Sequence, residues 1–545
     1  MGGQKQKINY KGPVVLAILD GVGLSSHIVG NAVRQAYTPN LDLLMGRYPL
    51  WQLKASGEAV GVPEGQAGNS EIGHYTMGSG QVVKQNELLV DEAVKTGKIF
   101  DGQTWKDAVQ GVLKNESKMH FVGIFSDGRV HSNMYHMLAM IQRASEQDVK
   151  KARVHILLDG RDVPPTSALK YVDILEEELA AYDAKGFDYK IASGGGRTYV
   201  TADRYGSDWP MVERGWQAHV LGTARPFTSA RAAIETFRQE QPSIQDQYLP
   251  PFTIVGDDGA PVGKMDDGDT VIYYDFRADR AIEFSEAMTV KDFDKFERGH
   301  VPRVYYAGMV EYDRDRHIPA HTLVEPVQVK HVLAEYLVSE GISRFVTSES
   351  IKFGHVTFYF NGNKNGRFSD KLEEYVDIPN KTGEPWQFPW MDSDKLTDIS
   401  IEKIKGGKFK SILVNYPNGD IVGHEAKMLP SIIAMEAVDL ALGRTMAAVD
   451  EAGGVLLVTA DHGNLEEEVY LGHRGGAMLK DGKPVPKTSH TTNPVPFVIY
   501  DNTENRDRYS KKSGDFGLSN IAATVALLHG LKPLPEWDEP VIELN

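Results

Sequence analysis

Five short apolar runs, each closed by small or polar residues, constrain the fold of this chain more than any other feature. They are VVLAILDG (14–21), HFVGIFSDG (120–128), VHILLDGRD (154–162), SILVNYPNGD (411–420) and VLLVTADHG (455–463). Continuous apolar runs are typical of strands that are covered on both faces, and a helix-like stretch follows each of them. The pattern therefore predicts an α/β fold with largely parallel sheets.

The length of the chain predicts more than one domain, because 545 residues exceed what a single hydrophobic core normally serves. Acidic and histidine residues of the kind that bind metals lie before residue 75 and after residue 415, and the middle has a strand and helix pattern of its own. We therefore expect one domain of residues 1–85 and 326–545, interrupted by a second domain of residues 86–325. The Gly- and Pro-rich stretch 361–392 is expected to form surface hairpins or long loops.

Composition excludes several classes of protein. Lys and Arg total 59 against 75 Asp and Glu, a net charge of −16 that argues against nucleic-acid binding. Cysteine is absent, which rules out disulfides, thiolate metal sites and a cysteine nucleophile. The N-terminus has no apolar signal core, and no run of about 18 apolar residues predicts a membrane span. We expect a soluble cytoplasmic protein.

Residues of the types that commonly bind divalent metal ions follow three of the apolar runs. Asp20, Asp420 and Asp461 stand at the carboxyl ends of their runs, which is where open α/β sheets place their ligand sites. Carboxylate and imidazole groups bind ions such as Mn²⁺, Zn²⁺ or Co²⁺, and two such ions can clamp the oxygens of a phosphoryl transfer. The histidines of this set are His424, His462 and His490.

Ser70 is the candidate nucleophile. It lies in GVPEGQAGNSEIGH at the expected start of a helix, where free backbone N–H groups and a positive dipole end suit a phosphate. An isolated serine in this position would ordinarily just cap the helix. Beside the metal-binding residues it can also act as a metal-bound alkoxide. The sequence thus indicates two metal ions around a serine nucleophile and a metal-dependent phosphoryl-transfer enzyme.

A second group of charged residues lies in Gly-rich or turn-like contexts in the middle of the chain. Arginine binds phosphate and carboxylate in a bidentate manner, so this group is a candidate recognition surface for both. Surface ion pairing is the alternative for each member. The group comprises His131, Arg161, Asp162, Arg197, Arg204, Arg277 and Arg280.

Eight motifs, taken in order, closely resemble the 2,3-bisphosphoglycerate-independent phosphoglycerate mutases of the alkaline phosphatase superfamily. They are GQAGNSEIGH, SDGRVHS, LLDGRDVPP, DFRADRA, KFGHVTFYF, NGDIVGH, TADHGN and SHTTNPVPF. The resemblance extends from about residue 13 to residue 530. It is specific, because the wider superfamily shares the metal-site motifs alone, whereas DGRD, FRADR and HVTFYF belong to this mutase.

The resemblance implies an alkaline-phosphatase-like metal domain interrupted by an inserted phosphotransferase domain. It implies an isomerase of glycolysis and gluconeogenesis that interconverts 3-phosphoglycerate and 2-phosphoglycerate through a phosphoserine at Ser70, without 2,3-bisphosphoglycerate. Two divalent ions would be needed, with Mn²⁺ as the first candidate and Co²⁺ or Mg²⁺ as alternatives. The family also suggests a monomer that has no nucleic-acid or membrane partner.

By matching motifs, one ion would be held by Asp420, His424 and His490, and the other by Asp20, Ser70, Asp461 and His462. Ser70 would attack phosphorus, and Lys352 would help to stabilise the transferring oxygens. Asp162, helped by Arg161, would move protons between the glycerate hydroxyls. The residues that would hold the substrate are His131, Arg161, Asp162, Arg197, Arg204, Arg277, Arg280 and Lys352.

The chain departs from the family pattern at a few places. Gln81 replaces the arginine of a GAGR loop, and one extra residue separates Arg197 from Arg204. The segment 463–489 is long and contains His473, a rival to His490. The alternative functions are a metal-dependent phosphatase, another phosphomutase, or a catalytically silent metal-binding scaffold. A simple phosphatase would not need the arginine group, and a silent protein would lack a ligand or the nucleophile.

Overall fold

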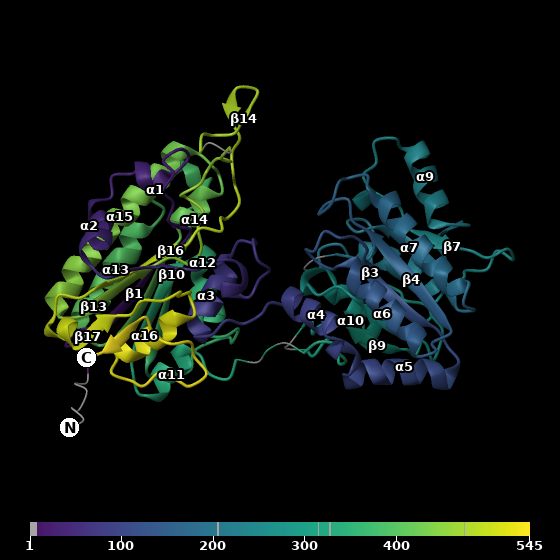
Figure 1. The fold of residues 1–545 in the computed structure, drawn as a ribbon, viewed down its shortest axis with the longest axis horizontal. Helices are drawn as coiled ribbons and strands as arrows, with labels where there is room; N and C mark the ends of the chain where they lie inside the picture. The colour runs from purple at the N-terminus through teal and green to yellow at the C-terminus, as the bar shows by residue number, and fades with distance from the viewer. Residues whose placement is uncertain (1–7, 204–205, 314–315, 326, 328, 473–474) are drawn as a thin grey trace. The chain divides into compact units, whose positions relative to one another are not determined.

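The computed structural model describes residues 8–203, 206–313, 316–325, 327, 329–472 and 475–545 (Figure 1). Two compact units make up the chain. Unit 1 is Met1–Lys84 with Gln328–Asn545, and unit 2 is Gln85–Val327. Each unit has its own seven-stranded sheet and its own hydrophobic core.

The sheet of unit 1 has the order β11-β10-β12-β1-β13-β16-β2. Its first five strands run parallel, and β16 and β2 are antiparallel to their neighbours. In sheet order the strands are Glu373–Ile378, Arg344–Glu349, Ser411–Tyr416, Val14–Leu19, Val455–Thr459, Val495–Tyr500 and Leu50–Leu53. Every residue of β1, β12 and β13 is buried, as expected for strands covered on both faces.

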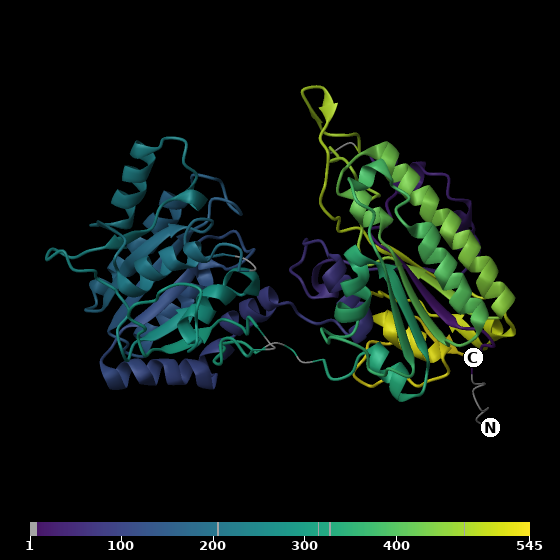
Figure 2. The same cartoon turned by 180° about the vertical axis from the view of Figure 1, so that it is seen from behind.

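Helices cover both faces of this sheet. The long helix α15 (Met428–Ala452) packs against α13 (Ser393–Gly406) and α2 (Pro39–Arg47) beside the strands (Figure 2). On the other face α3 (Ser70–Ser79), α11 (Leu333–Ser339) and α16 (Asn520–Leu528) pack together. The shorter helices are α1 (Ala32–Gln35), α12 (Ser350–Gly354) and α14 (Asn418–Gly423).

The sheet of unit 2 has the order β6-β7-β5-β4-β3-β8-β9, and β7 is antiparallel to β5 while the other pairs are parallel. In sheet order the strands are Arg225–Phe227, Phe252–Ile254, Asp188–Gly196, Lys151–Leu158, Met119–Ile124, Thr270–Tyr273 and Tyr305–Gly308. The helices are α4 (Asn86–Lys95), α5 (Gln103–Asn115), α6 (Met134–Glu146), α7 (Ala168–Asp183), α8 (Trp209–Gly215), α9 (Ala230–Glu240) and α10 (Ile282–Thr289). The predicted α/β class with largely parallel sheets is confirmed in both units.

Two stretches of unit 1 that are rich in polar and turn residues contain short strands. Residues 361–392 were predicted to form hairpins or loops, but they contain the edge strand β11, which pairs in parallel with β10. Five of the six residues in β11 are only partly buried or exposed, which is why the stretch lacks an apolar run. Residues 463–489 carry a two-residue hairpin, β14 (Leu479–Lys480) with β15 (Lys483–Pro484), whose residues are exposed.

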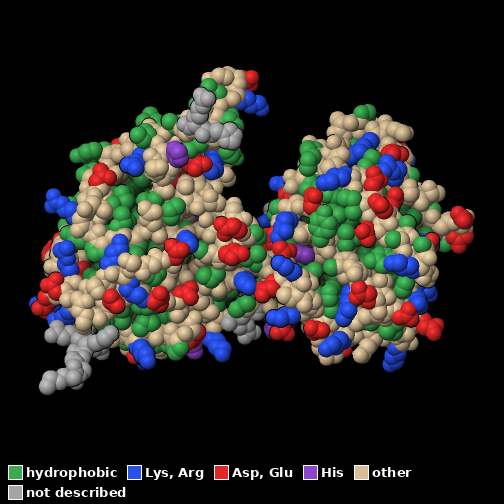
Figure 3. Space-filling view, viewed as in Figure 1, with side chains coloured by type: hydrophobic (Ala, Val, Ile, Leu, Met, Phe, Trp, Pro, Cys, Tyr) green, Lys and Arg blue, Asp and Glu red, His purple; other side chains and the backbone are tan. Residues whose placement is uncertain are grey.

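The surface of each unit mixes acidic and basic side chains on the face shown in Figure 3. Each helix in the described part of the chain is too short or too polar to cross a bilayer.

Candidate active site

The carboxyl edge of the unit 1 sheet gathers the three aspartates. Asp20 follows β1, Asp420 lies in the first turn of α14 just beyond β12, and Asp461 follows β13. Because β1 pairs in parallel with both β12 and β13, these strand ends are neighbours. All three carboxylates are buried.

Asp420 forms one cluster with His424 and His490. Its Oδ1 lies 3.0 Å from Nε2 of His490 and 3.2 Å from Nε2 of His424. The two Nε2 atoms are 3.1 Å apart. One carboxylate oxygen and two imidazole nitrogens thus converge on a single point.

A second cluster comprises Asp20, Asp461 and His462. Nε2 of His462 lies 3.5 Å from Asp20 Oδ1, 3.6 Å from Asp461 Oδ2 and 3.7 Å from Asp420 Oδ1. The last distance makes the two clusters adjacent.

Ser70 lies against the second cluster. Its Oγ is 2.9 Å from Nε2 of His462 and donates to Asp20 Oδ1 at 3.2 Å. The helix cap is Asn69 rather than Ser70, since the Asn69 side chain accepts the N–H of Ile72. The capping role considered for Ser70 therefore belongs to its neighbour, and the hydroxyl of Ser70 faces the carboxylates.

The orientation of the three histidines fits metal ligation. Nδ1 contacts a backbone carbonyl in each: His424 with Thr488 O at 2.7 Å, His490 with Gly68 O at 2.9 Å, and His462 with Gly463 O at 3.3 Å. An Nδ1–H that donates to a carbonyl leaves the lone pair on Nε2, which is the usual support of a metal-binding imidazole. Nε2 lone pairs that face one another and a carboxylate repel unless a proton or a metal ion lies between them.

The charge balance also fits bound cations. Three buried carboxylates face one ammonium group, that of Lys352, whose Nζ is 2.9 Å from Asp20 Oδ1 and 2.6 Å from Asp420 Oδ2 and also contacts Ser70 Oγ. Burial lowers the pKa of Lys352, but Asp20 and Asp420 outweigh it and raise that pKa above its usual value. Oδ2 of Asp461 makes no hydrogen bond among the described residues, although it lies 3.3 Å from Nδ1 of His74, which contacts Ser70 O at 2.8 Å. Buried carboxylates in excess need such compensation, which divalent ions would supply.

Unit 2 has a candidate site of its own at the carboxyl ends of its strands. Arg197 follows β5 and is almost fully buried; its Nη1 donates to Asp159 Oδ1 at 2.6 Å and also contacts Asp162. Asp159 follows β4, accepts the hydroxyl of Ser126 at 2.6 Å and the N–H of Asp162 at 3.1 Å. Asp159 was not predicted from the sequence, although Asp159 follows an apolar run just as Asp20 does.

The other predicted residues of unit 2 are only partly brought together. His131 Nδ1 and Arg277 Nε each lie 3.2 Å from a carboxylate oxygen of Asp279, another residue that sequence reasoning missed. Arg280 is buried and its Nη1 donates to Ala202 O at 2.6 Å. Arg161 is exposed. Arg204 lies outside the described residues, as does His473.

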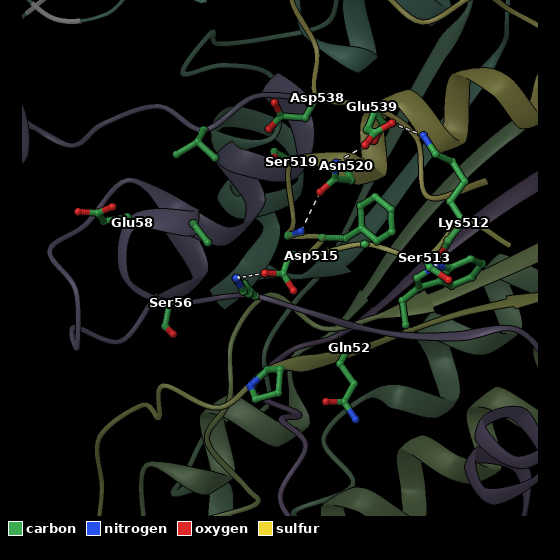
Figure 4. Close-up of a pocket in the computed structure, with 18 of the residues that line it drawn as sticks. Gln52, Ser56, Glu58, Lys512, Ser513, Asp515, Ser519, Asn520, Asp538 and Glu539 are labelled. Atoms are coloured by element: carbon green, nitrogen blue, oxygen red, sulfur yellow. Dashed lines mark hydrogen bonds and ion pairs between the residues drawn. The ribbon is translucent and has the colours of Figure 1, made fainter. Parts of the chain in front are cut away.

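The sites divide between the units: Ser70, Lys352 and the metal-binding residues belong to unit 1, and the arginine group belongs to unit 2. A hollow of about 1300 Å³ lies elsewhere in unit 1, beside β2 (Figure 4). Lys54 pairs there with Asp515 at 3.0 Å, and Lys512 pairs with Glu539. The hollow has more acidic than basic residues in its lining and includes no histidine and none of the clustered aspartates, so we place the candidate active site at the clusters described above.

Asp275, which follows β8 close to Arg197, gives a pH-dependent prediction. Burial raises the pKa of Asp275 to about 8, against about 3.9 in an unfolded chain. A carboxyl whose folded pKa is raised contributes stability below pH about 4 that is lost as the pH rises to about 8. Asp275→Asn does not titrate but can still accept the N–H of Ile124 through Oδ1, as Asp275 does at 2.9 Å.

We therefore expect the melting temperature of Asp275→Asn relative to wild type to rise between pH 5 and pH 8. Differential scanning fluorimetry across this range measures the difference. A difference that stays constant with pH would show that Asp275 is ionised in the folded protein at neutral pH.

The fold and the site together define an α/β protein with a buried serine beside two clusters of carboxylates and imidazoles, an arrangement suited to divalent metal ions and phosphoryl transfer. Comparison with known proteins narrows this class. Residues 90–314 match the family model described as BPG-independent PGAM N-terminus. A protein of Leptospira interrogans named probable 2,3-bisphosphoglycerate-independent phosphoglycerate mutase is 45% identical, covering 98% of this chain and 97% of its own.

Other relatives agree. The 2,3-bisphosphoglycerate-independent phosphoglycerate mutase of Trypanosoma brucei is 42% identical over 97% of both chains. The crystal structure of Leishmania mexicana phosphoglycerate mutase at low cobalt concentration superposes with a TM-score of 0.71 at 39% identity, covering 99% of this chain and 98% of that one. The chain belongs to the family of 2,3-bisphosphoglycerate-independent phosphoglycerate mutases, which confirms the family predicted from the motifs.

Proposed function

We propose that the protein interconverts 3-phosphoglycerate and 2-phosphoglycerate through a phosphoserine at Ser70 and does not need 2,3-bisphosphoglycerate. The observation that carries the proposal is the buried Ser70 hydroxyl, which lies at the N-terminus of α3 in contact with Lys352, His462 and Asp20. The names of the relatives support the reaction.

Two divalent ions complete this site in the proposal. Asp420, His424 and His490 would hold one ion, and Asp20, Ser70, Asp461 and His462 would hold the other. When bound, such ions lower the pKa of a ligating hydroxyl and polarise phosphoryl oxygens. We propose Mn²⁺ first, with Co²⁺ or Mg²⁺ as alternatives, because carboxylate and imidazole ligands suit these ions.

The residues of unit 1 have separate roles. Ser70 supplies the nucleophilic oxygen and, after transfer, carries the phosphoryl group. The ammonium of Lys352, held by Asp20 and Asp420, offsets negative charge on the transferring oxygens. The N–H of Ile72 donates to the Asn69 side chain, so the backbone N–H groups of Ser70 and Glu71, which have no partner within the helix, are the ones that can donate to the same phosphate.

The residues of unit 2 would hold the glycerate. A phosphoserine in contact with water would be hydrolysed, so the dephosphorylated substrate has to be retained until it is rephosphorylated. We propose that Arg161, Arg197, Arg204, Arg277, Arg280 and His131 bind its carboxylate and phosphate. Asp162, oriented by its ion pair with Arg197, would move the proton between the two hydroxyls. Residues 1–85 and 326–545 would then be the metal-binding domain and residues 86–325 the inserted phosphotransferase domain.

We further propose that the protein works as a monomer in the cytoplasm. The absence of cysteine fits a reducing compartment. The binding partner in this proposal is the small phosphoglycerate alone.

An enolase-coupled assay tests the function. Chelator-treated protein receives 3-phosphoglycerate and Mn²⁺ or Co²⁺, without added 2,3-bisphosphoglycerate, and released phosphate is followed in parallel. Mutase flux that requires the metal, with little free phosphate, is the expected result. Phosphate release without formation of 2-phosphoglycerate would identify a phosphatase and would remove the role given to the arginines.

A further inference from the structure

A chain of hydrogen-bonded polar side chains runs through the interior of unit 2, and none of its members has a role in the proposed reaction. Nearly all polar groups buried in a protein are paired, so such a chain is held in a single arrangement. All of its members are at most 2% exposed. In order they are Asp269, His120, His155, Ser193, His219 and Thr201.

The first half of the chain crosses from β8 to β4. Oδ2 of Asp269, the residue before β8, lies 3.0 Å from Nε2 of His120 on β3. Nδ1 of His120 lies 2.9 Å from Nε2 of His155 on β4. The two imidazole rings stack, with centroids 5.2 Å apart and planes 16° apart.

The second half leads from β4 to the loop after β5. Nδ1 of His155 lies 2.7 Å from Oγ of Ser193, which in turn lies 2.7 Å from Nδ1 of His219. A shift of register between Val154 and His155 sets Ser193 opposite His155. Nε2 of His219 lies 2.9 Å from Oγ1 of Thr201.

The protons in this chain can be arranged in one direction. Asp269 also accepts the N–H groups of Lys118 and Asp266, and a carboxylate accepts hydrogen bonds only. His120 therefore donates to it through Nε2 and accepts from His155 at Nδ1. A neutral imidazole has one donor and one acceptor. Nε2 of His155 therefore donates to His120, and Nδ1 of His155 accepts from Ser193.

The hydroxyl of Ser193 donates to His155 Nδ1 and accepts from His219 Nδ1. Nε2 of His219 is then an acceptor, and the hydroxyl of Thr201 must donate to it. Burial lowers the pKa of His219 to about 3 and lowers the pKa of His120 and His155 as well. The three rings are thus neutral at pH 7, as the directed chain requires.

Thr201, at the end of the chain, has a backbone conformation that needs support. Its φ is +70°, a value that is unfavourable for a β-branched residue and is found where the surrounding structure imposes it. Its N–H donates to Met211 O at 2.9 Å. The backbone of α8 also approaches closely, since a Cβ added at Gly215 would lie 2.0 Å from Thr201 Oγ1.

The loop that contains Thr201 supports two of the arginines proposed to bind phosphoglycerate. Arg197 lies four residues before Thr201, and the N–H of Val200 donates to Gly196 O at 2.8 Å in the same turn. The carbonyl of Ala202, the next residue after Thr201, accepts from Arg280 Nη1 at 2.6 Å. Movement of Thr201 would therefore displace the group that holds the Arg280 guanidinium.

We propose that Thr201 and His219 are positioning residues, which anchor the loop of residues 197–203 to the buried chain and so hold Arg197 and Arg280 in place for the phosphoglycerate. This inference rests on the proposed function, because it assigns the arginines to substrate binding. It adds a set of interior residues that never touch the substrate but control its affinity.

The first test compares Thr201→Val with Thr201→Ser in the mutase assay. Valine keeps the shape but cannot donate to His219, whereas serine keeps the hydroxyl. Loss of one hydrogen bond predicts a KM for 3-phosphoglycerate raised about 3- to 10-fold, with kcat within about twofold because binding alone is weakened. Thr201→Ser should keep a KM close to that of wild type. Thr236→Val is the control, because Thr236 lies in unit 2 but its hydroxyl donates to Ala232 O within α9 at 2.7 Å.

A second pair of variants keeps the proposal testable if Thr201→Val folds poorly. In His219→Gln the amide oxygen can replace Nε2 as the acceptor for Thr201. In His219→Asn the shorter amide can replace Nδ1 and reach Ser193 alone. The proposal predicts a raised KM in His219→Asn and a KM close to wild type in His219→Gln, with melting temperatures measured for both.

The outcomes separate this inference from the proposed function. Wild-type protein without mutase flux overturns the proposed function and the inference with it. Active wild-type protein with an unchanged KM in Thr201→Val, or equal KM values in the two His219 variants, overturns the inference alone. The inference is supported if KM is raised in Thr201→Val and His219→Asn and stays close to wild type in Thr201→Ser and His219→Gln.

Discussion

Ser70→Ala is expected to lower the mutase kcat by a factor on the order of 10⁴ or more, because the variant has no oxygen to accept the phosphoryl group. The surrounding carboxylates and imidazoles remain, so metal binding should be weakened far less than activity. The enolase-coupled assay measures the loss. Incubation with 3-phosphoglycerate followed by mass spectrometry of the intact protein should detect a phosphoserine in wild type and none in the variant.

Ser79→Ala is the matched control for this variant. Ser79 is buried in the same helix α3, but its hydroxyl donates to the carbonyls of Thr76 and Gln81 at the far end. We expect its kcat to stay within about threefold of wild type, because a neutral hydrogen bond contributes about 1 kcal/mol and here affects the helix end alone. Substantial mutase activity in Ser70→Ala would exclude the phosphoserine route.

Removal of divalent metal is expected to have the second large effect. A chelator should reduce the mutase rate to background, because three buried carboxylates and three imidazoles would lose the cations that offset and orient them. The melting temperature should fall as well, since a ligand present at 100 times its Kd stabilises the native state by about 2.7 kcal/mol. Adding back Mn²⁺, Co²⁺ or Mg²⁺ in turn would rank the ions by restored rate and by restored melting temperature.

His490→Ala links this effect to particular side chains. The variant should need a higher Mn²⁺ concentration for half-maximal activity, by about 10-fold or more, because it loses one ligand of its cluster. His331→Ala is the control, since His331 is an exposed histidine of the same unit, 3.9 Å from Glu335. Full activity in chelated protein, or an equal metal requirement in both variants, would contradict the assignment of the clusters.

The expected losses of activity in Ser70→Ala and on metal removal depend on the same arrangement of side chains. Lys352 neutralises part of the charge that Asp20 and Asp420 bring to Ser70, and the backbone carbonyls of Gly68, Gly463 and Thr488 orient the three imidazoles. The rigid strand ends hold these groups close together, so little rearrangement is needed when charge develops on the phosphoryl oxygens.

Local sequence determined the strands, the class of fold and the family. Short continuous apolar runs bounded by turn residues are typical of strands covered on both faces, and the aspartates that close three of them fall at the carboxyl edge of a sheet. The motifs around Ser70, Asp162 and His462 were specific enough to predict the family that the relatives confirm. These properties are readable because each depends on residues close together in the chain.

The tertiary structure decided what depends on contacts between distant segments. Asn69 rather than Ser70 caps α3, and β11 completes the sheet from a stretch that was predicted to be loop. The pairing of His155 with Ser193 requires a register shift that no spacing in the sequence indicates. Hydrogen bonds of this kind form between strands and loops far apart in sequence, so their partners are fixed only when the sheets have assembled and buried them.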